Sequence, residues 1–314
     1  MPDLHPELAR ARFLPPVSFN AALARPAQRL SARMRPPKAP EDVRIEERTA
    51  PGPEGAPPVR LRLYRPRRLD GTAPALLWIH GGGFLIGSPV QDEAGSAAFA
   101  RELGITVVSV GYRLAPQHPA PAALEDVYAA LSWVCEHAGE LGVDSERLAI
   151  GGASAGGGLT AALALACHDR GGPAPVFQLL VYPMLDDRTA LRTDIGARDV
   201  RMWTPASNRY AWSAYLGREP GGEDVSPYAA PARRADLSGL PPAWIGVGDV
   251  DLFHDEDLAY AERLRAAGVD CAVTVVPGAF HGFDAAFRGT ALAHEFHRTQ
   301  ERALRAALFP DKKD

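Results

Sequence analysis

The 314-residue chain lacks the sequence features of disulfide-bonded, zinc-binding, membrane-spanning and nucleic-acid-binding proteins. Its three cysteines, Cys135, Cys167 and Cys271, are widely spaced and form no C-x-x-C pair, so we expect reduced, buried thiols and not disulfides or a zinc site. No stretch approaches the roughly 18 continuous apolar residues of a membrane span. The net charge of −4 and the absence of a Lys/Arg run argue against a nucleic-acid partner. We expect a cytoplasmic protein that needs no metal or organic cofactor.

The segment from Met1 to Pro6 is polar and broken by proline, which does not fit a signal peptide. Residues 1–40 contain short helical runs interrupted by Pro15, Pro16 and Pro26, and they predict a peripheral helical arm. With 46% hydrophobic and 23% charged residues, the rest of the chain can bury a large core.

The pattern of apolar residues predicts an α/β fold with a mostly parallel central sheet flanked by helices. Val43 to Arg48 and Val59 to Tyr64 alternate apolar with polar residues, as half-buried antiparallel strands do. Short apolar runs that suit buried parallel strands then alternate with helical stretches. The strand runs are 75–79, 105–110, 148–150, 177–182, 243–247 and 272–276, and the helical runs are 93–103, 122–137, 159–168, 255–267 and 291–307.

One region interrupts this alternation. Residues 185–231 contain no clear strand and hold Trp203, Tyr210, Trp212 and Tyr215 at helical spacings. We interpret the region as a helical insertion that forms a cap together with the 1–40 arm. The catalytic domain then comprises residues 41–184 and 232–314.

A serine lies in the most informative motif of the chain. Gly152-Ala153-Ser154-Ala155-Gly156 has the pattern G-x-S-x-G, directly after an apolar run and directly before a helical run. Such a strand–turn–helix context lifts a nucleophilic hydroxyl above the sheet. An ordinary glycine-rich turn that packs a helix on a strand is the alternative interpretation.

A second glycine-rich motif, from His80 to Phe84, follows the strand at 75–79. Acyl transfer passes through an oxyanion, and backbone N–H groups of such a loop can bind it. We predict an oxyanion hole formed by the N–H groups of Gly82, Gly83 and Ala155. A purely structural loop is the alternative. His80 is expected to shape the loop and not to act as a base.

A nucleophilic serine needs a base, which in turn needs an orienting carboxylate. His281 follows the strand at 272–276, at the carboxyl end of the sheet where catalytic groups gather. Asp249 and Asp251 follow the strand at 243–247 and are both candidates for the acid. Asp255 and Asp257 fit the N-terminal turn of the next helix better.

The chain resembles the bacterial hormone-sensitive-lipase-like esterases of the α/β-hydrolase superfamily. Four motifs carry this resemblance: His80-Gly81-Gly82-Gly83-Phe84, Tyr112-Arg113-Leu114-Ala115-Pro116, Gly152 to Gly157, and Phe280-His281-Gly282-Phe283. The family pattern Asp-x-Leu-x-Asp-Glu selects Asp251 as the acid, because Asp255 and Glu256 follow at the matching offsets. Phe253 stands where the pattern has Leu, and Ala153, Gly111 and Gln117 also differ from the usual family residues.

The resemblance implies a serine carboxylesterase that hydrolyses short- to medium-chain acyl esters of small molecules through Ser154, His281 and Asp251. An amidase, a lactonase or a small-molecule deacetylase would use the same three residues. A non-catalytic receptor on this fold is disfavoured because the catalytic histidine is present. Aromatic residues expected to line the substrate pocket are Phe84, Tyr182, Trp203 and Phe283. The resemblance also suggests a homodimer through a sheet edge, for which Ala272 to Val276 is the expected edge strand.

Overall fold

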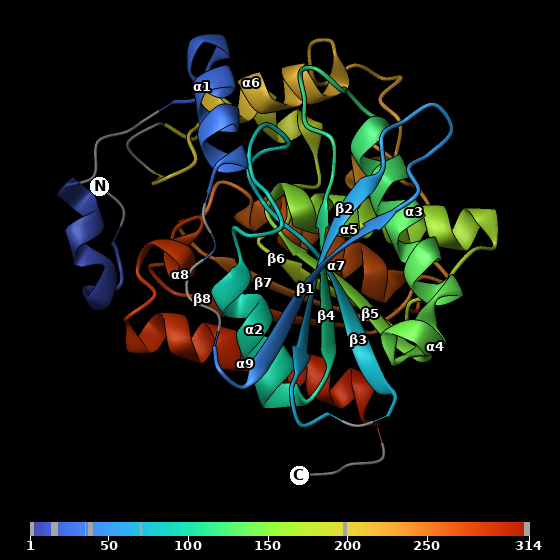
Figure 1. Ribbon diagram of the computed structural model, residues 1–314. Helices are drawn as coiled ribbons and strands as arrows, with labels where there is room; N and C mark the ends of the chain where they lie inside the picture. Colours follow the sequence, from blue (N-terminus) through green and yellow to red (C-terminus); the bar gives the residue numbers. More distant parts are fainter. Residues whose placement is uncertain are drawn as a thin grey trace.

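The computed structural model describes residues 3–13, 18–34, 36, 40–69, 71–196 and 200–310. Its centre is an eight-stranded sheet with the strand order β1-β2-β4-β3-β5-β6-β7-β8 (Figure 1). β1 and β2 are antiparallel, and β2 is antiparallel to β4; all other neighbours are parallel. The strands are β1 Val43–Ala50, β2 Val59–Pro66, β3 Ala73–Ile79, β4 Thr106–Gly111, β5 Val143–Ala153, β6 Phe177–Val181, β7 Ala243–Gly248 and β8 Cys271–Val276.

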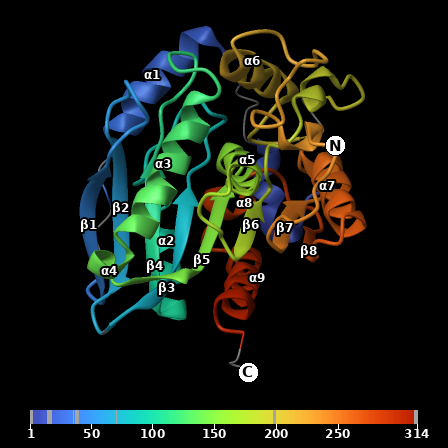
Figure 2. The same cartoon turned by 90° about the vertical axis from the view of Figure 1, so that its right-hand side faces the viewer.

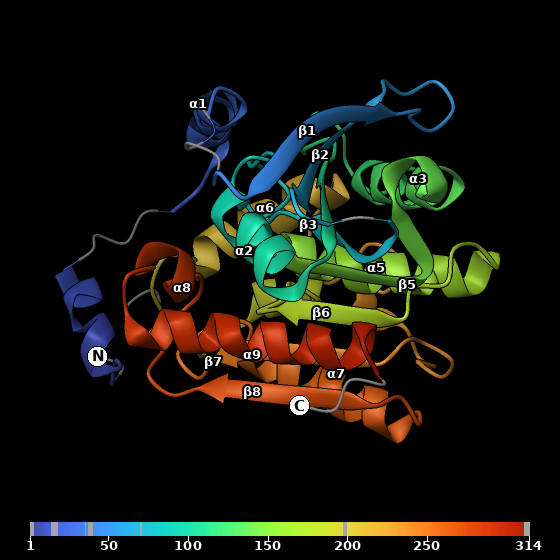
Figure 3. The ribbon, with the colours of Figure 1, turned by 60° about the horizontal axis from the view of Figure 1, so that its bottom comes forward.

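Helices cover both faces of the sheet, which explains why the central strands are apolar on both sides. Alternate residues of β3 belong to different cores: Leu77 is part of the core that includes residues of α3, α5 and α7, and Leu76 is part of the core that includes residues of α2 and α9. Figure 3 shows α2 and α9 on one side of the sheet. The helices are α1 Ala21–Ala32, α2 Glu93–Leu103, α3 Ala122–Glu136, α4 Ala138–Leu141, α5 Ala155–Arg170, α6 Pro205–Leu216, α7 His254–Ala266, α8 Phe283–Ala286 and α9 Ala291–Leu308, with 3-10 helices η1 Pro6–Phe13, η2 Asp187–Leu191 and η3 Pro231–Arg233.

The structure confirms the α/β architecture and corrects some details of the elements. α1 runs through Pro26, which was expected to interrupt it. Proline has no backbone N–H, so the helix loses one hydrogen bond at this position. The φ angle that the proline ring fixes is nevertheless compatible with helical backbone. Pro15 and Pro16 lie outside the described residues. β5 begins at Val143, five residues before the expected strand, and α5 begins at Ala155, four residues before the expected helix.

The two segments outside the sheet meet at one end of the molecule. α1 and α6 lie near each other at the top of Figures 1 and 2. The backbone N–H of Phe19 donates to Ser207 Oγ at 2.9 Å, and the ring of Phe19 packs on Trp203 with centroids 6.0 Å apart. The segment before α1 therefore contacts the 185–231 segment directly.

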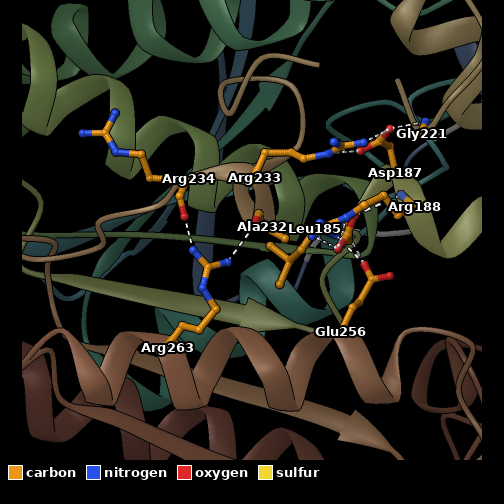
Figure 4. Close-up of polar contacts among 10 residues, drawn as sticks. Leu185, Asp187, Arg188, Gly221, Ala232, Arg233, Arg234, Glu256 and Arg263 are labelled. Atoms are coloured by element: carbon orange, nitrogen blue, oxygen red, sulfur yellow. Dashed lines mark hydrogen bonds and ion pairs between the residues drawn. The ribbon is translucent and has the colours of Figure 1, made fainter. Parts of the chain in front are cut away.

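Both ends of the 185–231 segment are held by buried polar contacts (Figure 4). Asp187, fully buried, accepts hydrogen bonds from the Arg233 guanidinium and from the N–H of Gly221. Arg263 of α7 donates to the carbonyl oxygens of Ala232 and Arg234. These contacts bring the start and the end of the segment together beside α7.

Glu256 of α7 adds a pH-sensitive contact at the same place. Its carboxylate accepts the N–H of Leu185 at 2.7 Å, and burial raises the pKa of this group to about 8. In the unfolded chain the pKa of a glutamate is about 4.3. The folded state therefore holds a proton that the unfolded state has released, and the stability contribution of Glu256 is lost as the pH rises through 8.

We expect Glu256→Gln to reduce the loss of stability between pH 5.5 and pH 8.5. The glutamine keeps an oxygen for the N–H of Leu185 but does not titrate. Melting temperatures of the wild type and the variant at the two pH values check this. Equal decreases in melting temperature for both proteins would contradict the raised pKa of Glu256. Burial also raises the pKa of Asp257, so the variant should keep part of the decrease.

Candidate active site

Ser154 occupies the sharp turn between β5 and α5. Its backbone angles, φ 58° and ψ −121°, are rarely adopted by a residue with a side chain. Hydrogen bonds fix the turn: the N–H of Ser154 donates to Val181, and its carbonyl accepts from Gly158 and Met184. A side chain at Gly156 would collide with the carbonyl of Ile79, so glycine is required where the helix crosses β3. The geometry is that of the turn predicted from G-x-S-x-G.

The structure brings Ser154, His281 and Asp251 together. His281 Nε2 lies 2.8 Å from Ser154 Oγ, and His281 Nδ1 lies 2.8 Å from Asp251 Oδ2. All three residues are buried, with exposures of 7%, 8% and 5% in that order. With Asp251 ionised, Nδ1 carries the proton and Nε2 is free to accept one from the serine hydroxyl.

The two aspartates left open by the residue pattern have different roles. Asp251 contacts His281 and also accepts the N–H of Phe253 at 3.0 Å, which fixes its carboxylate. Asp249 accepts the N–H of Gly278 at 2.6 Å, three residues before His281. Asp249 thus ties down the loop that carries the histidine without contacting its ring.

Aromatic rings surround the imidazole of His281. Tyr182 lies edge-on to it at 4.8 Å, Phe253 lies edge-on at 5.0 Å, and Trp203 is tilted at 6.4 Å between centroids. Tyr182 and Trp203 were expected near the site. Phe253 was not, although its position two residues after Asp251 could have indicated it.

The other two aromatic residues of the predicted pocket pack away from His281. Phe84 is stacked on Tyr215 at 3.8 Å and is 1% exposed. Phe283 is fully buried against Phe296, with ring centroids 5.0 Å apart. The structure therefore places the rings of Tyr182 and Trp203 against His281, and it encloses Phe84 and Phe283 among other side chains.

The glycine-rich loop lies beside the serine. Gly82 and Gly83 have positive φ angles of 119° and 60°. A side chain at Gly83 would collide with the ring of Trp203. Among the described residues, no acceptor is recorded for the N–H groups of Gly82, Gly83 and Ala155.

His80 supports this loop and does not contact the serine. Its Nδ1 lies 2.8 Å from the carbonyl oxygen of Gly81, and its ring stacks on Tyr112 at 4.3 Å. Burial lowers the pKa of His80 to about 4, so the ring is neutral at pH 7. The role expected from the sequence, shaping the loop, agrees with this packing.

Comparisons with known proteins agree with this geometry. The family model described as alpha/beta hydrolase fold matches residues 76–285. Carboxylesterase NlhH of Mycobacterium tuberculosis is 39% identical over 291 residues, covering 90% of this chain and 89% of the relative. The solved structure of a bacterial heroin esterase superimposes with a TM-score of 0.87 at 38% identity, covering 97% of this chain and 98% of that one. Ethyl acetate hydrolase of Pseudomonas putida is 34% identical over 71% of this chain and 70% of its own.

The chain therefore belongs to the α/β-hydrolase family, in its hormone-sensitive-lipase-like branch. Its enzyme class is that of the carboxylic ester hydrolases. The resemblance stated from the four motifs is confirmed. None of the described helices is long and apolar enough to cross a membrane.

Proposed function

We propose that this protein is a serine carboxylesterase that hydrolyses short- to medium-chain acyl esters of small molecules. The observation that carries the proposal is the continuous hydrogen-bonded chain from Ser154 through His281 to Asp251, with both contacts at 2.8 Å. Such a chain activates a serine that is otherwise a weak nucleophile.

The reaction follows from the positions of these atoms. His281 Nε2 takes the hydroxyl proton as Ser154 Oγ attacks the ester carbonyl, and Asp251 stabilises the imidazolium that forms. The tetrahedral intermediate collapses when His281 returns the proton to the leaving alcohol, which leaves an acyl-serine. Water, deprotonated by His281, then attacks the acyl group and releases the acid and the free serine.

The N–H groups of Gly82, Gly83 and Ala155 bind the oxyanion in this proposal. Replacing Gly83 with alanine forces a side chain into a backbone with φ 60° and against Trp203. Alanine keeps the backbone N–H, but this strain should shift it away from the oxyanion. We therefore expect kcat/KM for p-nitrophenyl acetate to fall by about 100-fold, comparable to the loss of one oxyanion donor. Gly55→Ala is a matched control, because Gly55 also has positive φ, 74°, but has open space around it and lies in the β1–β2 loop. Similar losses in both variants would contradict the proposal.

We also propose that the 1–40 arm and residues 185–231 form a cap over the serine. The contacts of Phe19 with Ser207 and Trp203 support it, since Trp203 packs on both Gly83 and His281. Tyr182 and Trp203 then face the substrate directly. Phe84 and Phe283 would support this pocket from behind.

The acyl preference can be tested with p-nitrophenyl esters from acetate to palmitate. One relative is named ethyl acetate hydrolase, after a small ester, and we expect a preference for small esters here. Fast cleavage of short chains and slow cleavage of palmitate would support the proposal. No turnover at any chain length would favour the receptor alternative. Cleavage of amides or lactones but not of esters would favour those alternative activities.

Two further properties are proposed. β8 is an edge strand of the sheet, as expected, with Val275 39% exposed, and a second copy could pair with it. Light scattering in solution would show a monomer if this is wrong.

The three cysteines are free thiols, which suits the cytoplasm, and fractionation of the source cells tests that location.

A further inference from the structure

A cavity of about 540 Å³ lies between α2 and α9, on the face of the sheet opposite α5. Figures 1 and 3 show these two helices side by side. The cavity is also lined by Ala153 and Tyr182, next to the serine turn, whereas Ser154, Asp251 and His281 do not line it. Its inner wall therefore adjoins the active site.

Aromatic rings form a large part of the inner wall. Trp78 and Phe99 are in contact, with ring centroids 5.9 Å apart, and Phe99 stacks on His297 at 4.5 Å. Tyr182 completes the wall beside the serine turn. Burial lowers the pKa of His297 to about 4, so this ring is neutral at pH 7 and behaves as another aromatic surface.

Two half-buried carboxylates lie among these rings. Asp92 accepts a hydrogen bond from Trp78 Nε1 at 2.9 Å, and Asp284 accepts one from the Tyr182 hydroxyl at 2.8 Å. Within the described part of the chain, neither carboxylate forms an ion pair. Burial raises the pKa of both groups, and Asp284 contributes to the shift at Asp92 through its charge. A cation between them would relieve this cost.

The other charged residues at the cavity do not supply that cation. Arg101 is bonded to Glu102 and Arg298 to Glu295, and both arginines are exposed. Arg288, also exposed, offsets only part of the charge of Asp92. In addition, Ser96 lines the cavity, is 2% exposed, and its hydroxyl has no partner among the described residues.

We propose that this cavity binds an organic ammonium group, which is held between Asp92 and Asp284 beside the rings of Trp78, Phe99 and Tyr182. Aromatic faces attract ammonium groups, most strongly when water is excluded, and carboxylates supply the opposite charge. The ammonium group has two sources: the acyl part of an ester substrate, or a separate small molecule that acts as an effector. The first source rests on the proposed esterase function, and the second does not.

The cavity is connected with the catalytic histidine through one side chain. Tyr182 donates its hydroxyl to Asp284 and places its ring edge-on to His281. A ligand that contacts Asp284 therefore acts on a ring that positions the base. An effector bound here would change turnover without competing for the serine.

The binding test uses choline and its neutral isostere 3,3-dimethylbutan-1-ol, titrated calorimetrically into the intact protein and into Ser154→Ala. We expect one choline per chain, bound at least about tenfold more tightly than the neutral alcohol. The double variant Asp92→Asn/Asp284→Asn keeps acceptors for Trp78 and Tyr182 but removes both charges, and it should weaken choline binding at least about tenfold. Glu262→Gln is the matched control, because Glu262 is an exposed carboxylate of α7 that neither lines the cavity nor, among the described residues, pairs with an arginine that does.

Turnover of a cationic and a neutral ester distinguishes the two sources of the ammonium group. We compare p-nitrophenyl 4-(trimethylammonio)butanoate with the isosteric p-nitrophenyl 5,5-dimethylhexanoate. A preference for the cationic ester that disappears in the double variant but not in Glu262→Gln assigns the ammonium group to the substrate. Choline that changes kcat for the neutral ester without raising its KM indicates an effector.

The neutral ester also separates a specific effect from damage to the fold, since a general structural defect lowers turnover of both esters equally. Equal binding of choline and the neutral alcohol, together with a cationic-to-neutral turnover ratio that the double variant leaves unchanged, would overturn the proposal. Failure to hydrolyse any ester would refute the proposed esterase alone, because choline binding is measured without turnover.

Discussion

Replacing Ser154 with alanine should lower kcat/KM for p-nitrophenyl acetate by about 10⁴- to 10⁶-fold, because the residues of such a triad act as a unit. The variant keeps the glycine-rich loop and the other residues around position 154, so a small residual rate above that of water is expected. A stopped or continuous assay of nitrophenolate release over several hours can measure both rates.

The fold of Ser154→Ala should be unchanged. Alanine fits the space of the serine and tolerates the φ of 58° no worse, so the melting temperature should change little. A variant with near wild-type turnover and a normal melting temperature would show that another residue is the nucleophile. A covalent adduct of a fluorophosphonate on the wild type but not on the variant would identify the nucleophile independently.

The second large effect is expected at the acid. Asp251→Asn should lower kcat by about 10³- to 10⁴-fold, because the amide can hold the wrong imidazole tautomer and cannot stabilise the imidazolium. The loss should be in kcat and not in KM, since Asp251 does not reach the substrate.

Asp249→Asn is the matched control for this prediction. It lies two residues away in the same turn, and asparagine can still accept the N–H of Gly278. Its turnover should stay within about tenfold of the wild type. A larger loss in Asp249→Asn than in Asp251→Asn would reverse the assignment of the two carboxylates.

The fold was largely predictable because the central strands are buried on both faces and are therefore continuously apolar. The starts of β5 and α5 were not predictable. In the first half of β5, the residues from Asp144 to Arg147 are polar and only partly buried, so this part of the strand lacks the apolar pattern that predicts a buried strand. The start of α5 consists of glycines, which are poor helix formers in general. Here they are required by close contacts, such as that of Gly156 with the carbonyl of Ile79.

The meeting of Ser154, Asp251 and His281 was predictable because each residue follows a strand of the sheet, and the topology brings these strand ends to the same edge. This rule does not distinguish Asp249 from Asp251, since both follow β7. The packing of the four aromatic residues could not be predicted from the sequence. An aromatic residue near a motif can pack on the histidine, as Tyr182 does, or on other core rings, as Phe283 does. That depends on packing between distant segments, which no local pattern records.

The bond between Asp187 and Arg233 has a consequence for how this protein can diverge. It joins the two ends of the 185–231 segment, so the entropy of closing that loop depends only weakly on the number of residues within it. Doubling the length would cost about 0.6 kcal/mol. Shorter, longer or unrelated segments can therefore be exchanged between these two fixed ends while β5, β7 and the loop after β8 keep their places. The range of accepted molecules can then change quickly during evolution while the bond-breaking chemistry stays constant.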